Sequence, residues 1–100
     1  MENWYEDDDR IYMTDDTGRM VAQVVFPDVT PGVVNIQHTY VDDSLRGHGV
    51  AGRLVKAAAI RLRQEHKRAV LTCPYARKWF AAHPEYQDIQ QDSNPKDEVK

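Results

Sequence analysis

The sequence predicts an α/β (α+β) fold in which a small antiparallel meander leads into a βαβ unit, with helices packed on the sheet. Three segments rich in β-branched residues come first, separated by clusters of turn-forming residues. A helical pattern of apolar residues follows, and then a short apolar run. A chain of 100 residues allows one domain. We expect it to span residues 1–100, with a core of about 10–89 and a flexible tail at 90–100.

The meander is predicted from residues 10–14, 20–26 and 33–41. The first two segments flank Asp-Asp-Thr-Gly at 15–18 and form a hairpin with a longer loop. A second turn cluster, which contains two prolines and a glycine, fills 27–32. We expect 33–41 to be one continuous third strand, because its β-branched residues form an almost unbroken run.

The βαβ unit is predicted from the helical pattern over residues 50–66. Apolar residues spaced by three and four form one stripe, which consists of Ala51, Leu54, Val55, Ala58 and Leu62. The apolar run 69–73 is a strand, and the strand–helix–strand order predicts that it lies parallel to the third strand.

A second helix is predicted over residues 75–82. Trp79 and Phe80 are its expected core anchors. The helix should stop near His83, because Pro84 disfavours helical backbone in the residue before it.

The net charge of −3 conceals an uneven distribution. Residues 1–45 carry ten acids and two bases, whereas residues 46–78 carry nine bases and one acid. The basic block is either a solvated helix face or a surface that attracts a polyanionic ligand. The acidic first half, in turn, would favour a cationic substrate.

Several classes of protein are disfavoured. No apolar run approaches the ~20 residues that span a membrane, and the acidic residues 1–6 do not predict a secretory signal. Cys73 is the one cysteine, so no internal disulfide forms, and a cytoplasmic location is expected. The four histidines lack metal-ligand spacing, so we predict no metal.

A glycine-rich turn joins the third strand to the long helix. Gly47, Gly49 and Gly52 leave backbone N–H groups unobstructed, and the following helix adds its positive N-terminal dipole. This arrangement predicts an anion site, most naturally for the pyrophosphate of a nucleotide-bearing cofactor. It is neither a P-loop nor the dinucleotide-binding fingerprint, because the spacing differs from both.

Four motifs in order extend this interpretation. They are His-Thr-Tyr-Val at 38–41, Arg-Gly-His-Gly-Val-Ala at 46–51, Cys-Pro-Tyr-Ala at 73–76 and His-Pro-Glu-Tyr at 83–86. The second resembles the Arg/Gln-x-x-Gly-x-Gly/Ala motif of the GNAT superfamily of acyl-coenzyme A-dependent N-acetyltransferases. Taken together, the four resemble the small, single-domain GNAT-like family over roughly residues 10–89.

The resemblance implies that acetyl-coenzyme A is the cofactor. The backbone of Thr39 and Val41 would pair with its pantetheine arm like an added strand. Cys73, Tyr75 and Lys78 are further implied contacts, and basic side chains would meet the 3′-phosphate. The pyrophosphate would lie on the loop formed by Arg46, Gly47, His48, Gly49, Val50 and Ala51.

The resemblance also implies N-acetyl transfer to an unidentified primary amine. Cys73, before a helix N-terminus that favours thiolate, would act as a transient nucleophile. The other route is direct attack by the amine, with His38 as base and Tyr75 as acid. Each of the three residues has a structural alternative: a buried small side chain, a hydrogen-bonded histidine and a packing aromatic.

The chain departs from larger GNAT enzymes in lacking a helix pair between the first two strands and a hairpin after Ala82. The acceptor side is therefore open, which makes a bulky amine such as a protein lysine easier to accommodate. Two alternatives stay open: a non-catalytic acyl-coenzyme A binder or sensor, and a nucleic-acid-binding module that uses the basic residues 46–78. We expect a monomer or weak dimer with no membrane and no nucleic-acid partner.

Overall fold

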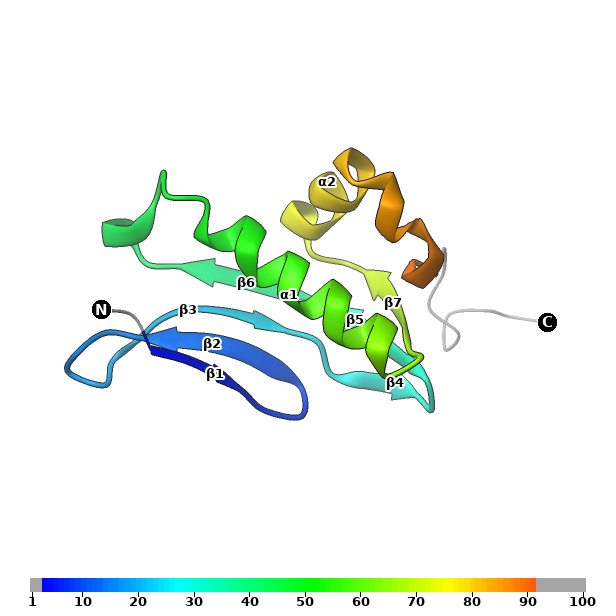
Figure 1. Cartoon of the computed structure of the whole chain (residues 1–100), viewed down its shortest axis with the longest axis horizontal. Helices are drawn as coiled ribbons and strands as arrows, with labels where there is room; N and C mark the ends of the chain where they lie inside the picture. The colour runs from blue at the N-terminus through cyan, green and yellow to red at the C-terminus, as the bar shows by residue number, and fades with distance from the viewer. Residues whose placement is uncertain (1–2, 92–100) are drawn as a thin grey trace.

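The computed structural model describes residues 3–91 as a two-layer arrangement of strands and helices (Figure 1). In chain order the elements are β1 (Asn3–Glu6), β2 (Arg10–Thr14), β3 (Met20–Val25), β4 (Asp28–Thr30), β5 (Val33–Ile36), β6 (His38–Val41), η1 (Asp43–Leu45), α1 (Val50–Gln64), β7 (Arg68–Leu71), α2 (Pro74–Ala82) and η2 (Pro84–Ile89), where η marks a 3-10 helix. The expected tail lies, from residue 92 onward, outside the described residues.

The strands form two sheets. One is antiparallel with the order β1-β2-β3-β6, and the other has the order β4-β5-β7 with β5 and β7 parallel. The predicted meander, the parallel pair and the α+β class are therefore confirmed. Two short strands, β1 and β4, lie in segments for which the sequence predicted no strand.

The prediction of one strand over residues 33–41 is wrong. The run breaks at Gln37, so that β5 pairs with β7 and β6 pairs with β3. The N–H of Gln37 donates to the carbonyl of Val25 at 3.1 Å, which draws the chain toward β3. Each half thus gains its own set of ladder hydrogen bonds, which outweighs the local preference of a continuous β-branched run.

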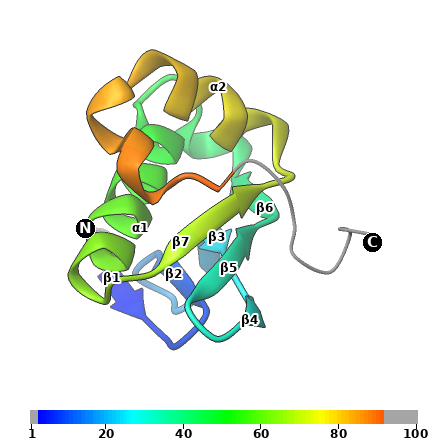
Figure 2. The same ribbon diagram turned by 90° about the vertical axis from the view of Figure 1, so that its right-hand side faces the viewer.

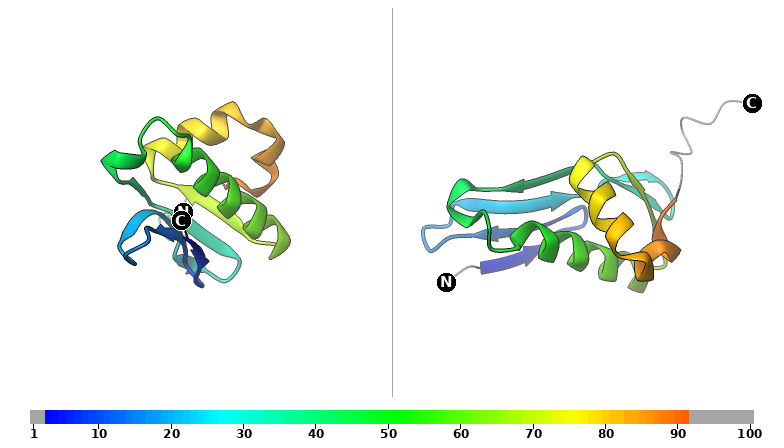
Figure 3. Two further views of the ribbon diagram at one scale, coloured as in Figure 1. Left: turned by 60° about the vertical axis from the view of Figure 1, so that its left-hand side comes forward. Right: turned by 90° about the horizontal axis from the view of Figure 1, so that it is seen from above.

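Both helices lie on the same side of the strands, as the two views of Figure 3 show. Helix α1 packs on β2, β3, β6 and β7, and α2 packs on β7 and α1. The helix α1 ends two residues before the predicted limit, and α2 begins one residue earlier, with Pro74 in its first turn. Figure 2 shows η2 returning beside α1 and β7.

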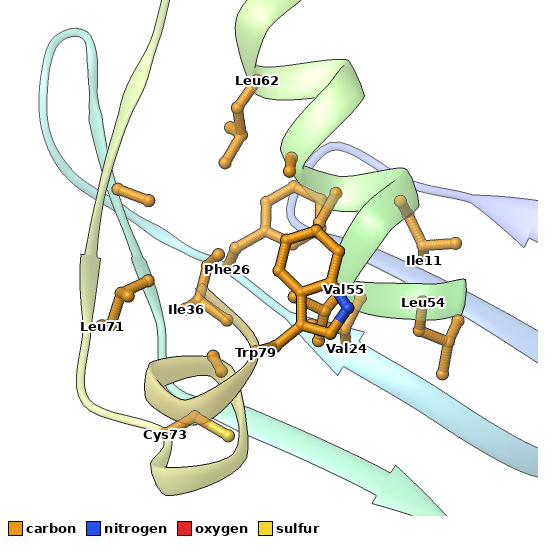
Figure 4. Close-up of a cluster of buried hydrophobic side chains, with 14 of the residues drawn as sticks. Ile11, Val24, Phe26, Ile36, Leu54, Val55, Leu62, Leu71, Cys73 and Trp79 are labelled. Carbon is orange, nitrogen blue, oxygen red and sulfur yellow. The ribbon is translucent and has the colours of Figure 1, made fainter. Parts of the chain in front are cut away.

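The core fills the space between the two layers. Figure 4 shows Leu54, Val55 and Leu62 of α1 facing side chains of the strands, with Trp79 of α2 beside them. Four of the five residues of the predicted helical stripe are buried, and Ala51 is half-buried. Trp79 and Phe80 are buried as predicted, at 8% and 3% exposure.

In the part of the chain that the structure describes, no helix is both long and apolar enough to cross a bilayer.

Candidate functional site

The site begins where the two sheets part. Ile36 and Leu71 are the last residues paired between β5 and β7. The carbonyl of Ile36 then accepts hydrogen bonds from the N–H groups of both Thr72 and Cys73, at 3.2 and 3.1 Å. Beyond this point β6 pairs with β3, whereas the segment after β7 turns into α2. Among the described strands, the divergence leaves one edge of β6 without a neighbour.

The free edge of β6 presents the backbone of Thr39 and Val41. The N–H of Asp42 donates to the carbonyl of Val21 at 2.8 Å. Every second residue before Asp42, that is Tyr40 and His38, therefore directs its backbone groups toward β3. In an antiparallel ladder the intervening residues direct their N–H and C=O groups the other way. Within residues 3–91, Thr39 and Val41, whose backbone was expected to pair with an extended ligand, therefore direct their N–H and C=O groups away from β3.

The glycine turn leads into α1. Gly47 and Gly49 have positive φ angles of 86° and 72°, which a residue with a side chain adopts only at a cost. Gly49 is the N-cap of α1 and offers no side-chain cap, so the first amides of the helix keep their donors for another acceptor. Arg46 pairs with Asp43 at 3.1 Å, and 72% of its side chain is exposed.

One cavity of about 380 Å³ connects the free edge of β6, the glycine turn and α2. Its lining includes most of the residues predicted to bind a cofactor, namely Thr39, Val41, Arg46, Gly47, Gly49, Val50, Ala51 and Tyr75. Segments separated by more than thirty residues in sequence thus converge on one hollow. The N-terminal end of α1 and the free edge of β6 therefore face the same space.

Two lining residues, Leu45 and Gly52, were not among the expected cofactor contacts, although Gly52 was counted among the glycines of the turn. Gly52 lies inside α1, and a Cβ there would come within 3.3 Å of the Tyr75 hydroxyl and 3.7 Å of Trp79 Nε1. A glycine inside a helical pattern was the available signal of a close approach. Leu45 is half-buried and packs against the core, and its sequence context gave no such signal.

Three of the predicted cofactor-binding residues do not line the cavity. His48 and Lys78 are exposed, the first on the glycine turn and the second on α2. Cys73 is buried at 5% exposure, and its Sγ lies 3.4 Å from the Thr39 hydroxyl, immediately behind the β6 edge. The thiol is thus adjacent to the cavity but covered.

The other candidate for acid–base chemistry, His38, is exposed and lies outside the cavity. It alternates with Thr39 along β6, so its side chain points to the opposite face of the sheet. Tyr75 lines the cavity and is 40% exposed. His83 caps the end of α2, as expected, with Nδ1 2.7 Å from the Trp79 carbonyl and its ring stacked on the indole.

The loop from β6 to the glycine turn is held by Asp42, which begins η1. Its carboxylate accepts hydrogen bonds from the Ser44 hydroxyl at 2.6 Å and the Ser44 N–H at 3.1 Å. These bonds, with smaller contributions from Arg19 and Tyr40, lower the pKa of Asp42 to about 2.

Asp42 should therefore keep the loop anchored in mild acid. Because the folded pKa lies below the ordinary value of ~3.9, its stabilising contribution is present above pH ~3.9 and is lost as the pH falls through about 2. A carboxyl-carbon NMR titration should place the midpoint near 2, and Asp42→Asn should remove the pH dependence of the Ser44 amide shift. A midpoint near 3.9 would contradict the hydrogen-bonded anchor.

Among residues 3–91, no group of three or more His, Cys, Asp or Glu side chains is arranged to hold a metal ion.

Comparisons with known proteins bear on this site. A family model described as GCN5-related N-acetyl-transferase matches residues 10–89. The protein NATD1 of Gallus gallus and that of Homo sapiens are both 38% identical over 63 residues, which make up 63% of this chain. The match covers 57% and 56% of those proteins, so it spans a little over half of their length.

Two solved structures are similar in fold. A GCN5-like protein of Staphylococcus aureus, solved by NMR, has a TM-score of 0.75 and 24% identity, with 98% of this chain and 96% of that chain covered. The GNAT family N-acetyltransferase YhbS of Escherichia coli, in complex with CoA, has a TM-score of 0.50 and 26% identity. That comparison covers 58% of this chain and 35% of the other.

Proposed function

Because the chain belongs to the family of GCN5-related N-acetyl-transferases, we propose that it binds acetyl-coenzyme A in the cavity beside β6 and transfers the acetyl group to a primary amine. Membership confirms the resemblance stated from the four motifs. The observation that carries the proposal is the convergence of two binding surfaces on one cavity: the uncapped start of α1 and the free edge of β6.

These two surfaces fit the two chemically different parts of coenzyme A. The amides of the Gly47–Ala51 turn and the N-terminal dipole of α1 favour a pyrophosphate. Thr39 and Val41 offer backbone donors and acceptors that match the amides of a pantetheine arm. Arg46, whose side chain is largely exposed at the cavity, adds positive charge for the phosphates.

Acetyl-coenzyme A, when bound, supplies an activated thioester. Tyr75 would give its hydroxyl proton to the leaving sulfur, a role supported by its position in the lining of the cavity. The incoming amine loses its proton to water, through which His38 would act as the base, because the His38 side chain points to the sheet face opposite the cavity. We favour this direct route over one through Cys73, because the Cys73 thiol is buried behind Thr39.

The test combines acetyl-coenzyme A calorimetry with intact-mass analysis of the same mixture. We expect binding with one ligand per chain and, with an amine panel, turnover that continues in Cys73→Ala. A covalent adduct with the mass of one acetyl group, abolished by Cys73→Ala, would replace the direct route by one through the thiol. Absence of binding would refute the proposal.

A non-catalytic acyl-coenzyme A sensor is the second candidate. It is favoured by one observation: no histidine, aspartate or glutamate is among the residues that line the cavity, so the described site shows no base beside the thioester position. Binding without turnover of any amine in the panel would select this function. Loss of turnover in His38→Ala, with binding retained, would instead support the catalytic one.

Replacing Thr39 with proline is expected to weaken acetyl-coenzyme A binding about tenfold, the effect of losing one hydrogen bond. The substitution removes an N–H that faces the free edge, where proline is tolerated. Calorimetry measures the change. Thr39→Val retains the N–H and should bind normally, whereas Tyr40→Pro removes a bond to β3 and should lower the melting temperature. Unchanged affinity in Thr39→Pro would argue against strand-like pairing of the arm.

A further inference from the structure

The antiparallel sheet has one face that no helix within residues 3–91 covers. A row of side chains crosses this face at one register level, with one residue from each strand: Tyr5, Tyr12, Gln23 and Tyr40. Their neighbours along the strands, such as Ile11 and Val24, point to the helices and are buried. Tyr5 is 45% exposed, and its ring stacks on that of Tyr12 with 5.3 Å between the centroids. We call these four residues the tyrosine row.

The two layers of the protein carry opposite charges. Residues 3–25 and 38–42, which form the antiparallel sheet and its turns, contain seven carboxylates and two arginines, whereas residues 46–78 contain nine bases and one acid. Both arginines of the sheet layer are already paired, Arg10 with Asp7 and Arg19 with Asp15 and Asp42. The glycine turn is thus the first segment of the basic helix layer, whereas the tyrosine row lies on the acidic sheet layer.

The tyrosine row already holds one cation of the chain itself. The guanidinium of Arg10 lies over the ring of Tyr12, 4.0 Å from its centroid. The same group donates to Asp7 at 3.0 Å and to Gln23 at 3.4 Å. An aromatic face, an amide oxygen and a carboxylate at the turn therefore form a combination that accepts a guanidinium or ammonium group.

The tyrosine row ends at the functional site. Tyr40 and His38 are on β6 and alternate with Thr39 and Val41, which line the cavity. A ligand lying along the row would therefore reach the strand that separates the open face from the cofactor cavity. The uncovered face and the cavity therefore lie on opposite sides of β6.

From these observations we infer that the tyrosine row is the docking surface for the acceptor: a lysine- and arginine-rich segment of a protein, which delivers one of its amines to the cavity at β6. The inference rests on the proposed function and names the substrate class of the same site. A cationic segment complements the carboxylates of the sheet layer, whereas a nucleic acid would be repelled by them. A second copy presenting the same face would bring like charges together.

The test is an amide NMR titration of the full-length protein with a synthetic peptide of alternating lysine and serine, beside its glutamate-for-lysine counterpart. We expect shifts at Tyr5, Tyr12, Gln23 and Tyr40 with the lysine peptide alone, weakening as salt is added. Tyr5→Ser, and separately Asp8→Asn with Asp9→Asn, should weaken binding about fivefold. Ile60→Ser, a comparably exposed residue on the helix layer, should change nothing.

In transfer assays with the same peptide, Tyr5→Ser should raise KM about fivefold and leave kcat unchanged. Shifts confined to α1 and α2, equal binding of the glutamate peptide, preferential binding of a single-stranded oligonucleotide, or self-association through this face would each overturn the inference. Acetyl-coenzyme A calorimetry on the same samples separates the two proposals. Intact cofactor binding without peptide shifts refutes the docking surface alone, whereas lost cofactor binding refutes the function.

Discussion

Replacing Gly49 with valine is expected to weaken acetyl-coenzyme A binding about 100-fold. Gly49 has a φ of 72°, which costs a residue with a side chain ~1–2 kcal/mol and is least favourable for a β-branched one. Valine would relieve that strain by turning the start of α1, which would redirect the amides proposed to hold the pyrophosphate. A lost charge-assisted hydrogen bond adds ~1.5 kcal/mol or more, so the sum approaches ~3 kcal/mol.

Two variants separate backbone strain from effects on the site. Gly18 has a φ of 89° in the turn between β2 and β3, away from the cavity. Gly18→Val should therefore lower stability without changing the calorimetric affinity. Gly49→Asn tolerates the positive φ and should retain more binding than Gly49→Val. If Gly18→Val and Gly49→Val weakened binding equally, the effect would be one of stability, and the assignment of the turn would fail.

Replacing Trp79 with alanine is expected to lower the free energy of unfolding by ~3–5 kcal/mol. The Trp79 ring is 8% exposed, stacks on His83 with 3.9 Å between centroids, and contacts Phe80 edge-on. It also lies beside Gly52, where α2 meets α1. For a domain of this size the melting temperature should fall by at least ~12 °C in a calorimetric or circular-dichroism scan.

Because Trp79→Ala can leave little folded protein, Trp79→Phe is the informative companion. It keeps an aromatic ring against His83 and should lose a smaller part of the stability. Ile60→Ala is the matched control, since Ile60 is 40% exposed on α1 and should shift the melting temperature by only a few degrees. A loss below ~1 kcal/mol in Trp79→Ala would show that α2 is not anchored through this ring.

The parts of the site that depend on local chemistry were predictable from the sequence. The glycine turn was recognisable because closely spaced glycines stand between a β-branched run and a helical stripe. The burial of Trp79 was predictable because it is a large aromatic residue in a helix that also carries charged residues. The pairing of β7 with the third segment followed from the strand–helix–strand order, because that crossover usually joins parallel neighbours.

The parts that depend on distant partners were not predictable. Nothing in Val33–Val41 marks Gln37 as a break, because the break is made by Val25 on one side and by the β7 strand on the other. The acidic segment at the start of the chain resembles a strand poorly, yet β1 forms because it pairs with β2 and Arg61 of α1 binds the carbonyls of Asp7 and Asp8. Such contacts are visible only once the chain is folded.

The break at Gln37 has a consequence for cooperativity. The two sheets diverge beyond that residue, and their continuity is interrupted beside β6. A pantetheine arm hydrogen-bonded to Thr39 and Val41 would extend the hydrogen-bonded ladder at the free edge of β6. It would thereby couple the local opening of one sheet to that of the other. We therefore expect saturating acetyl-coenzyme A to slow amide hydrogen exchange in β3 and in β7 together, although only β6 would touch the arm. The cofactor would then also be a structural component, which makes the fold and the substrate thermodynamically interdependent.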